Sequence, residues 1–193
     1  YEIIKCDWSS DVCSSDLEWK EKNMSERSKR AGKRNQSERR SELIKALWGS
    51  EEVPTWHRLE NDGFSTVPRY LPLIGVLMDS LSKGSPLSTT YLALWFRVSD
   101  EGLIEIRDKT VLAYESGFAS DRGVTTWTGR MRKLKELGFI STREGSTGEF
   151  HNVLIIHPLY VVKKLLEDGV ITKGRTYNIL AERVVEIKAS WGE

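Results

Sequence analysis

The sequence predicts a mainly α fold that carries one small antiparallel sheet. Apolar residues recur at helical spacing in several segments, most clearly at Val124, Trp127, Met131 and Leu134. Short stretches with strand character lie at residues 103–106, 139–143 and 150–157. Proline and glycine separate these segments at positions where helices commonly begin or end. The predicted order is helix, helix, strand, helix, helix, strand, strand, followed by two more helices.

The first 23 residues are not expected to belong to the natural protein. The string Asp7–Leu17, DWSSDVCSSDL, resembles the translation of a widely used DNA-sequencing adapter, and Met24 is a plausible natural start. A genuine acidic tail is the alternative. Residues 1–23 hold three basic and six acidic residues, so the remainder has 26 basic and 22 acidic residues and a net charge of +4 instead of +1. Both cysteines also fall in this segment, so no disulfide framework is expected.

Residues 24–66 are predicted to form an arm, a short helix and a linker. Residues 24–40 are polar and basic, which is typical of a disordered arm that lies along phosphates or in a minor groove; a solubilising tail is the alternative. Ser41–Trp48 is a short amphipathic piece, and Gly49–Thr66 has the composition of a linker.

A folded domain is predicted over residues 67–157. A helix over Leu71–Lys83 follows Pro68, and Ser88 is expected to cap a second helix that contains TTYLALWFR. Leu103–Ile106 is predicted as a short strand. No internal repeat suggests a second copy of this domain.

Two helices and a tight turn are predicted next. Asp108 is a candidate N-cap of the first helix, which runs to about Ser116 with Val111, Leu112 and Ala113 facing inward. Gly117 suits the turn because glycine tolerates positive φ. Ser120 is the candidate N-cap of the second helix, and Gly138 suits its C-terminal cap.

The outward face of the second helix is polar and basic. At 100° per residue this face carries Arg122, Thr125, Thr126, Gly129 and Lys133, with Arg130 and Arg132 on its two flanks. Arginine, lysine and threonine are suited to hydrogen bonding with base edges. Gly129 costs about 1 kcal/mol of helix stability relative to alanine, which is understandable if a DNA strand approaches the backbone there. An ordinary solvated face is the alternative.

A hairpin is predicted after this helix. Residues 139–143 and 150–157 flank the turn EGSTGE, whose glycines and hydroxyl residues are typical of hairpin loops. Arg143, Ser146, Thr147 and His151 are candidate contacts to phosphates or the minor groove. The alternative is a hairpin that only closes the sheet. Helix, turn, helix and wing together predict double-stranded DNA binding, with the second helix in the major groove.

Residues 158–193 are predicted to form two C-terminal helices. Pro158 opens one that reaches Asp168 and stops at Gly169, and the other covers about residues 176–189. Tyr177, Leu180, Val184 and Ile187 form one stripe of the second helix. We expect that stripe either to pack on the domain or to pair with a second copy in a homodimer.

The block from Pro68 to Leu165 resembles bacterial winged-helix proteins, in particular uncharacterised ones found on plasmids and integrative elements. PRYLPLI, LALWFR, TTWTGRMRKLKELGFI and VLIIHPLYVVKKL carry the resemblance, over about half of the chain. It implies DNA binding and control of transcription or of element maintenance. The residues carried over are those of the outward helix face: Arg122, Thr125, Thr126, Arg130 and Lys133.

The sequence is compatible with four functions. A transcriptional regulator is favoured, and a replication initiation or maintenance protein that binds origin repeats is the alternative. Replication initiators often hold two winged helices in one chain, and only one is visible here. A protein-interaction module is less favoured, because a docking face should expose apolar residues. An enzyme is not expected: His57, His151 and His157 show no metal-ligand or catalytic spacing, so no catalytic residue, metal or cofactor is predicted. No apolar run could span a membrane, and a cytoplasmic location is the default expectation.

Overall fold

The computed structural model describes residues 32, 34–49 and 55–192, and the chain divides into two units at residue 60. In the first unit a helix spans residues 34–48, and its described side chains are exposed. This helix begins before the predicted piece Ser41–Trp48, so residues 34–40 of the expected disordered arm are helical instead. The adapter-like segment, residues 1–23, lies outside the described residues.

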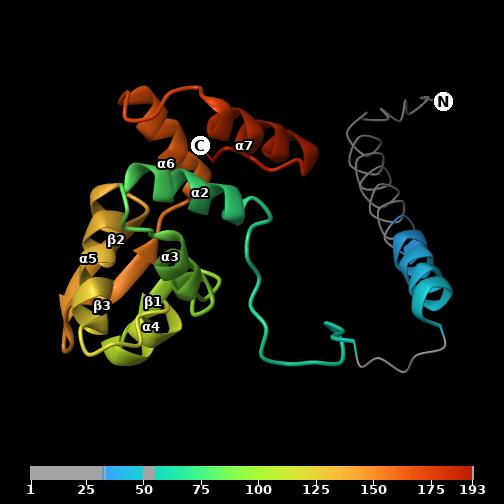
Figure 1. Cartoon of the computed structure of the whole chain (residues 1–193), viewed down its shortest axis with the longest axis horizontal. Coiled ribbons are helices and arrows are strands. Elements are labelled where there is room, and N and C mark those ends of the chain that lie inside the picture. The colour runs from blue at the N-terminus through green and yellow to red at the C-terminus, as the bar shows by residue number, and fades with distance from the viewer. Residues whose placement is uncertain (1–31, 33, 50–54, 193) are drawn as a thin grey trace, which may run out of the picture. The chain divides into compact units, whose positions relative to one another are not determined.

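The second unit holds the remaining elements (Figure 1). In chain order they are α2 (Leu71–Leu81), α3 (Ser88–Trp95), β1 (Leu103–Glu105), α4 (Lys109–Glu115), α5 (Gly123–Glu136), β2 (Ile140–Gly145), β3 (Gly148–Ile155), α6 (Pro158–Glu167) and α7 (Arg175–Glu186). The prediction of a mainly α fold with a small antiparallel sheet is confirmed, and the elements follow the predicted order.

The sheet has three strands in the order β1-β3-β2, and both pairs are antiparallel. Val153 on the central strand is the Cα partner of Ile104 on β1 and of Thr142 on β2. These three side chains are buried, since they share the face of the sheet that the helices cover.

Trp127 anchors the core between α5 and the sheet. Its side chain is fully buried, and its ring meets the ring of Phe150 on β3 edge to face, with centroids 5.8 Å apart. Met131 and Leu134 follow at helical spacing and are also fully buried. The predicted inward stripe of α5 is therefore confirmed at these three positions, while Val124 is only partly buried.

The start of α3 is capped by α2 and not by its own serine. The carboxylate of Asp79 accepts hydrogen bonds from the amides of Leu87 (2.6 Å) and Ser88 (2.9 Å). It also accepts one from the Ser88 hydroxyl at 2.6 Å. The prediction that Ser88 caps α3 is wrong, because Ser88 is the first helical residue and its hydroxyl binds the true cap.

The N-terminus of α4 is built as predicted. The Asp108 carboxylate accepts hydrogen bonds from the amides of Thr110 (2.7 Å) and Val111 (3.4 Å), and these bonds lower its pKa. Leu112 and Ala113 are buried, but Val111 is 44% exposed, so its predicted inward orientation is wrong. Three consecutive residues of a helix span about 200° and cannot all face one core.

The turn between α4 and α5 differs from the prediction at one end. Gly117 adopts φ +88° as expected. Ser120 does not cap α5: its carbonyl accepts the Gly123 amide at 2.7 Å in a preceding turn, and the helix begins only at Gly123. A Cβ at Gly123 would collide with the Phe118 carbonyl, which explains a glycine at the first position. At the C-terminal end of α5, Gly138 has φ +83° and follows the helix in the left-handed conformation that was predicted.

Both hairpin strands reach closer to the turn than predicted. Gly145 pairs with Gly148, so only Ser146 and Thr147 form the turn, and a register shift lies between Arg143 and Gly145. The predicted six-residue loop was too long, because its glycines pair with each other as the last residues of the strands.

The two C-terminal helices belong to the same domain. Pro158 opens α6, and α7 packs against α2, with Leu180 and Val184 buried. In Figure 1, α2, α6 and α7 gather at one end of the domain, away from α4. Packing on the domain, one of the two predicted roles of the α7 stripe, is therefore the role it has within the monomer.

Candidate nucleic-acid interface

The predicted contact residues of α5 do not all share one environment. Arg122, Thr125, Gly129 and Arg132 are exposed on the side opposite the buried Trp127 stripe. Thr126 and Lys133 are half-buried at one edge of that side. The exposed side of α5 is therefore rotated about the helix axis relative to the predicted face: it includes Arg132 and excludes Thr126 and Lys133. Lys135 and Glu136 are also exposed on this helix and were not among the predicted contacts.

Gly129 lies at the middle of the exposed strip. A Cβ placed on it would have no heavy atom within 4 Å, so nothing in the fold requires a glycine there. Two helical glycines of the same unit differ: a Cβ at Gly123 would meet backbone, and one at Gly75 would come within 3.0 Å of the Ser88 Cβ. Gly129 therefore leaves the backbone of α5 accessible to an approaching molecule at a cost in helix propensity.

Arg130 packs against the domain instead of extending outward. Its guanidinium carbon lies 5.8 Å from the centroid of the Phe118 ring, a cation–π arrangement. Its Nε is buried and has no hydrogen-bond partner among the described residues. Arg130 therefore contributes to the packing between α5 and the α4–α5 turn and is only partly exposed.

Several basic side chains of α5 form ion pairs with acidic residues. Glu149 on β3 lies 3.5 Å from Nε of Arg132 and 3.3 Å from Nζ of Lys135, one carboxylate oxygen for each. Lys133 forms an ion pair with Glu136 at 2.7 Å. The sequence does not reveal the pair with Glu149, because Glu149 comes from another element, and the prediction of the α5 face did not include Glu136. The interface is consequently less positive than the predicted list of cations suggests.

The candidate contact residues of the β2–β3 hairpin divide into exposed and internal ones. Arg143 and Ser146 are exposed. Thr147 is half-buried, and its hydroxyl donates to the Ile106 carbonyl at 2.7 Å and lies 3.0 Å from Nδ1 of His151. Thr147 and His151 therefore fasten the turn to the end of β1. Part of the hairpin therefore closes the sheet, and Arg143 and Ser146 stay exposed.

Lys109 is a candidate contact that the sequence did not reveal. It is the first residue of α4, and its Nζ lies 3.3 Å from the position that a Cβ of Gly148 would occupy. The fold thereby places a cation beside the wing turn. No local motif marks it, since the approach of α4 to the hairpin depends on the sheet register.

The described residues show neither a metal centre nor a membrane segment. No group of three or more histidine, cysteine or acidic side chains gathers there at a spacing that would hold a metal ion. No helix within the same ranges combines the length and the apolar content that crossing a bilayer requires.

Comparison of the chain with protein-family models, with curated proteins and with solved structures finds no match.

Proposed function

We propose that the chain binds double-stranded DNA, with α5 in the major groove and the β2–β3 hairpin beside it. One observation carries the proposal: the side of α5 opposite the buried Trp127 exposes Arg122, Thr125, an unconstrained Gly129 and Arg132. These groups can donate to base edges and phosphates, and the glycine permits a close approach. Exposed Arg143 and Ser146 on the hairpin extend the same chemistry.

Within DNA binding, transcriptional regulation is the role we propose. The described residues contain one helix-turn-helix and hairpin unit, whereas replication initiators often carry two. Binding as a homodimer to half-sites about one helical turn apart would give the specificity that a regulator needs. A replication or maintenance protein of a mobile element remains the alternative role of the same surface.

A titration of labelled DNA duplexes with the full chain tests the proposal. One duplex contains the region upstream of the gene, one contains an origin repeat, and one has a scrambled sequence. Fluorescence anisotropy is recorded at two salt concentrations. We expect the upstream duplex to bind tightest, with an affinity that falls as salt rises, because phosphate contacts release counterions. Tighter binding to the origin repeat would favour the alternative role, and equal binding to all three would contradict sequence-specific recognition.

A pair of variants tests which surface binds. Arg122→Ala removes an exposed cation of the strip, and Lys173→Ala removes an exposed cation between α6 and α7. We expect Arg122→Ala to weaken binding by about tenfold and Lys173→Ala to change it little, with similar melting temperatures. Equal weakening by both variants would mean that net charge alone governs binding.

Exposed apolar residues on α3 and α4 support protein interaction as a second candidate. Phe96 is 59% exposed and Tyr114 is 69% exposed, and Leu92 and Val111 are also exposed. The sequence disfavours a docking module because the outward face of α5 is positive and rich in hydroxyl groups. The exposed apolar residues lie on helices other than α5, so protein binding at this second surface is compatible with DNA binding at the first. A pull-down that is lost in Phe96→Ser but kept in Arg122→Ala would support it.

A further inference from the structure

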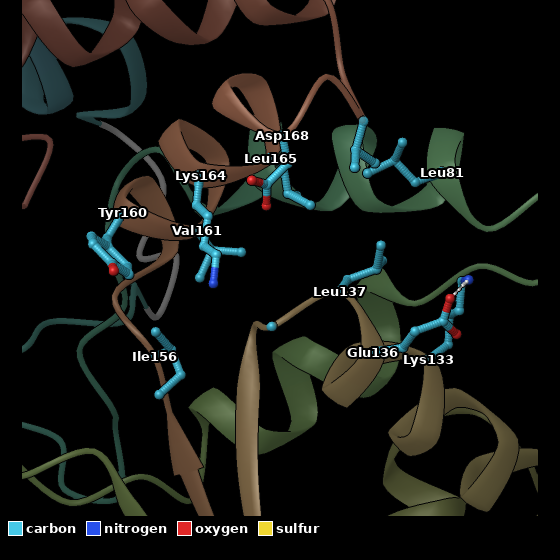
Figure 2. A pocket seen from close by; sticks show the side chains of 12 residues that line it. Leu81, Lys133, Glu136, Leu137, Ile156, Tyr160, Val161, Lys164, Leu165 and Asp168 are labelled. Atoms are coloured by element: carbon cyan, nitrogen blue, oxygen red, sulfur yellow. Dashed lines mark hydrogen bonds and ion pairs between the residues drawn. The ribbon is translucent and has the colours of Figure 1, made fainter.

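A cleft lies between the C-terminal end of α5, the helix α6 and the end of α2 (Figure 2). Its volume is about 510 Å³, within the range of roughly 300–1,000 Å³ that small-molecule sites occupy. Apolar side chains line much of it, among them Leu81, Leu137, Val161 and Leu165. An apolar group of moderate size would therefore be shielded from water there.

Four charged side chains also line the cleft, and two of them satisfy each other. Lys133 and Glu136 form an ion pair at 2.7 Å, which Figure 2 shows at one wall. Lys164 on α6 and Asp168, the residue that follows α6, differ: both are exposed, and neither side chain forms a hydrogen bond or ion pair with another described residue. The cleft thus offers one unpaired cation and one unpaired carboxylate.

Lys164 and Asp168 are one helical turn apart. Residues at this spacing are neighbours on one face, with about 5–6 Å between their Cβ atoms. Their charged groups are nevertheless more than 4.0 Å apart, since no ion pair joins them. This arrangement suits a ligand that carries both charges close together. A simple anion would pair with Lys164 but lie near the Asp168 carboxylate, and a simple cation would lie near Lys164.

We propose that the cleft binds a small zwitterion with a large apolar side chain, the chemistry of an apolar α-amino acid. Its carboxylate accepts from Lys164, its ammonium donates to Asp168, and its side chain packs against Leu81, Leu137 and Leu165. The assignment does not depend on DNA binding. The last turn of α5 forms one wall of the cleft, so the amides of Leu137 and Gly138 report occupancy.

Three probes with the same aromatic body separate the contributions of the two charges. L-phenylalanine carries both charges, hydrocinnamate only the carboxylate, and phenethylamine only the ammonium. Amide NMR spectra of the full chain are recorded during titration with each. For L-phenylalanine we expect shifts at Leu137, Gly138 and Leu165 and a dissociation constant of roughly 1 mM, reasonable for so small a ligand. The other two probes should bind about tenfold more weakly.

Charge-neutral variants with neighbours as controls complete the test. Lys164→Met should reduce the affinity for L-phenylalanine to that for phenethylamine, and Asp168→Asn should reduce it to that for hydrocinnamate. Lys163→Met and Glu167→Gln remove exposed charges of the same helix that do not line the cleft, and they should leave binding unchanged. Equal affinity for the three probes, an absence of shifts at the cleft, or equal losses in the controls would overturn the proposal.

Discussion

The carboxylate of Glu149 on β3 lies 3.5 Å from the guanidinium Nε of Arg132 on α5. The same carboxylate also lies 3.3 Å from Nζ of Lys135, so one acidic residue of the hairpin holds two cations of the proposed DNA-reading helix. All three side chains are at least 41% exposed, so these pairs contribute little to stability. Their main effect is on the charge that α5 presents.

Replacing Glu149 by glutamine should therefore strengthen DNA binding. Glu149→Gln releases Arg132 and Lys135 for phosphates, and we expect a few-fold higher affinity and a steeper dependence of affinity on salt. Glu144→Gln is the matched control, because Glu144 is an exposed acid of the same hairpin that forms no ion pair with α5. Anisotropy titrations at several salt concentrations measure both. Equal gains in the two variants would show that Glu149 acts only through net charge.

Substitution of Gly129 should separate stability from binding. Gly129→Ala is expected to stabilise the domain by roughly 0.5–1 kcal/mol, because the new Cβ meets open space and alanine favours helix. Gly129→Gln should be at least as stable as the parent yet bind DNA less tightly, since a long side chain fills the approach to the backbone. Urea unfolding and anisotropy measure the two effects. Unaltered affinity in the glutamine variant would place α5 away from the duplex at this position.

Trp127 should be the most sensitive position of α5. Truncation to alanine removes a fully buried ring and its edge-to-face contact with Phe150, and we expect a loss of about 3–5 kcal/mol in the free energy of unfolding. Thr125→Ala on the exposed side should change it by less than about 0.5 kcal/mol. Denaturant unfolding measures both variants. A Trp127→Ala protein as stable as its parent would mean that the inward face of α5 is assigned wrongly.

The two turn residues of the hairpin should behave differently. Thr147→Val removes the hydroxyl that donates to the Ile106 carbonyl, and we expect a destabilisation of about 1 kcal/mol that Thr147→Ser largely avoids. Ser146→Ala should leave stability unchanged and weaken DNA binding slightly, since Ser146 is exposed. Thermal melting and anisotropy distinguish the two roles. The assignment fails if Thr147→Val melts like the parent.

The ion pair between α3 and α4 should contribute to acid sensitivity. Arg97 donates two hydrogen bonds to the Glu115 carboxylate, at 2.8 and 2.6 Å, and they lower the pKa of Glu115 below its ordinary value of 4.5. The stability that the pair provides is present above the unfolded-state pKa and is lost as pH falls through the folded-state pKa. Glu115→Gln should therefore lower the melting temperature near pH 7 by more than it does below pH 4.5, the ordinary pKa of the group. A constant difference at both pH values would exclude this linkage.

Local patterns in the sequence were sufficient for most of the fold. Helical spacing located the buried side of α5. The capping side chain of Asp108, the glycines at positions 117 and 138 and the proline at position 158 marked the ends of elements. These features depend on interactions within one element or one turn, so they can be recognised without knowing what packs nearby. The fold class is confirmed for the same reason.

The features that were missed involve two elements at once. Asp79 caps α3 from α2, Glu149 approaches α5 from β3, and Thr147 binds the end of β1. These partners cannot be predicted from spacing along the sequence, because they lie in different elements and meet only in the folded chain. The structure exposes several of the predicted α5 contact residues, whereas Arg130 packs on Phe118 and Thr147 binds the Ile106 carbonyl.

The Asp79 cap also sets a limit on autonomous folding. A fragment that begins at α3 keeps the three strands and the helices α4 and α5, yet it leaves the amides of Leu87 and Ser88 without their acceptor. It also strips α7 of the helix on which it rests. The smallest fragment of this domain that folds by itself should therefore start ahead of Leu71 and retain Val184, because the first and last helices of the domain, α2 and α7, pack against each other.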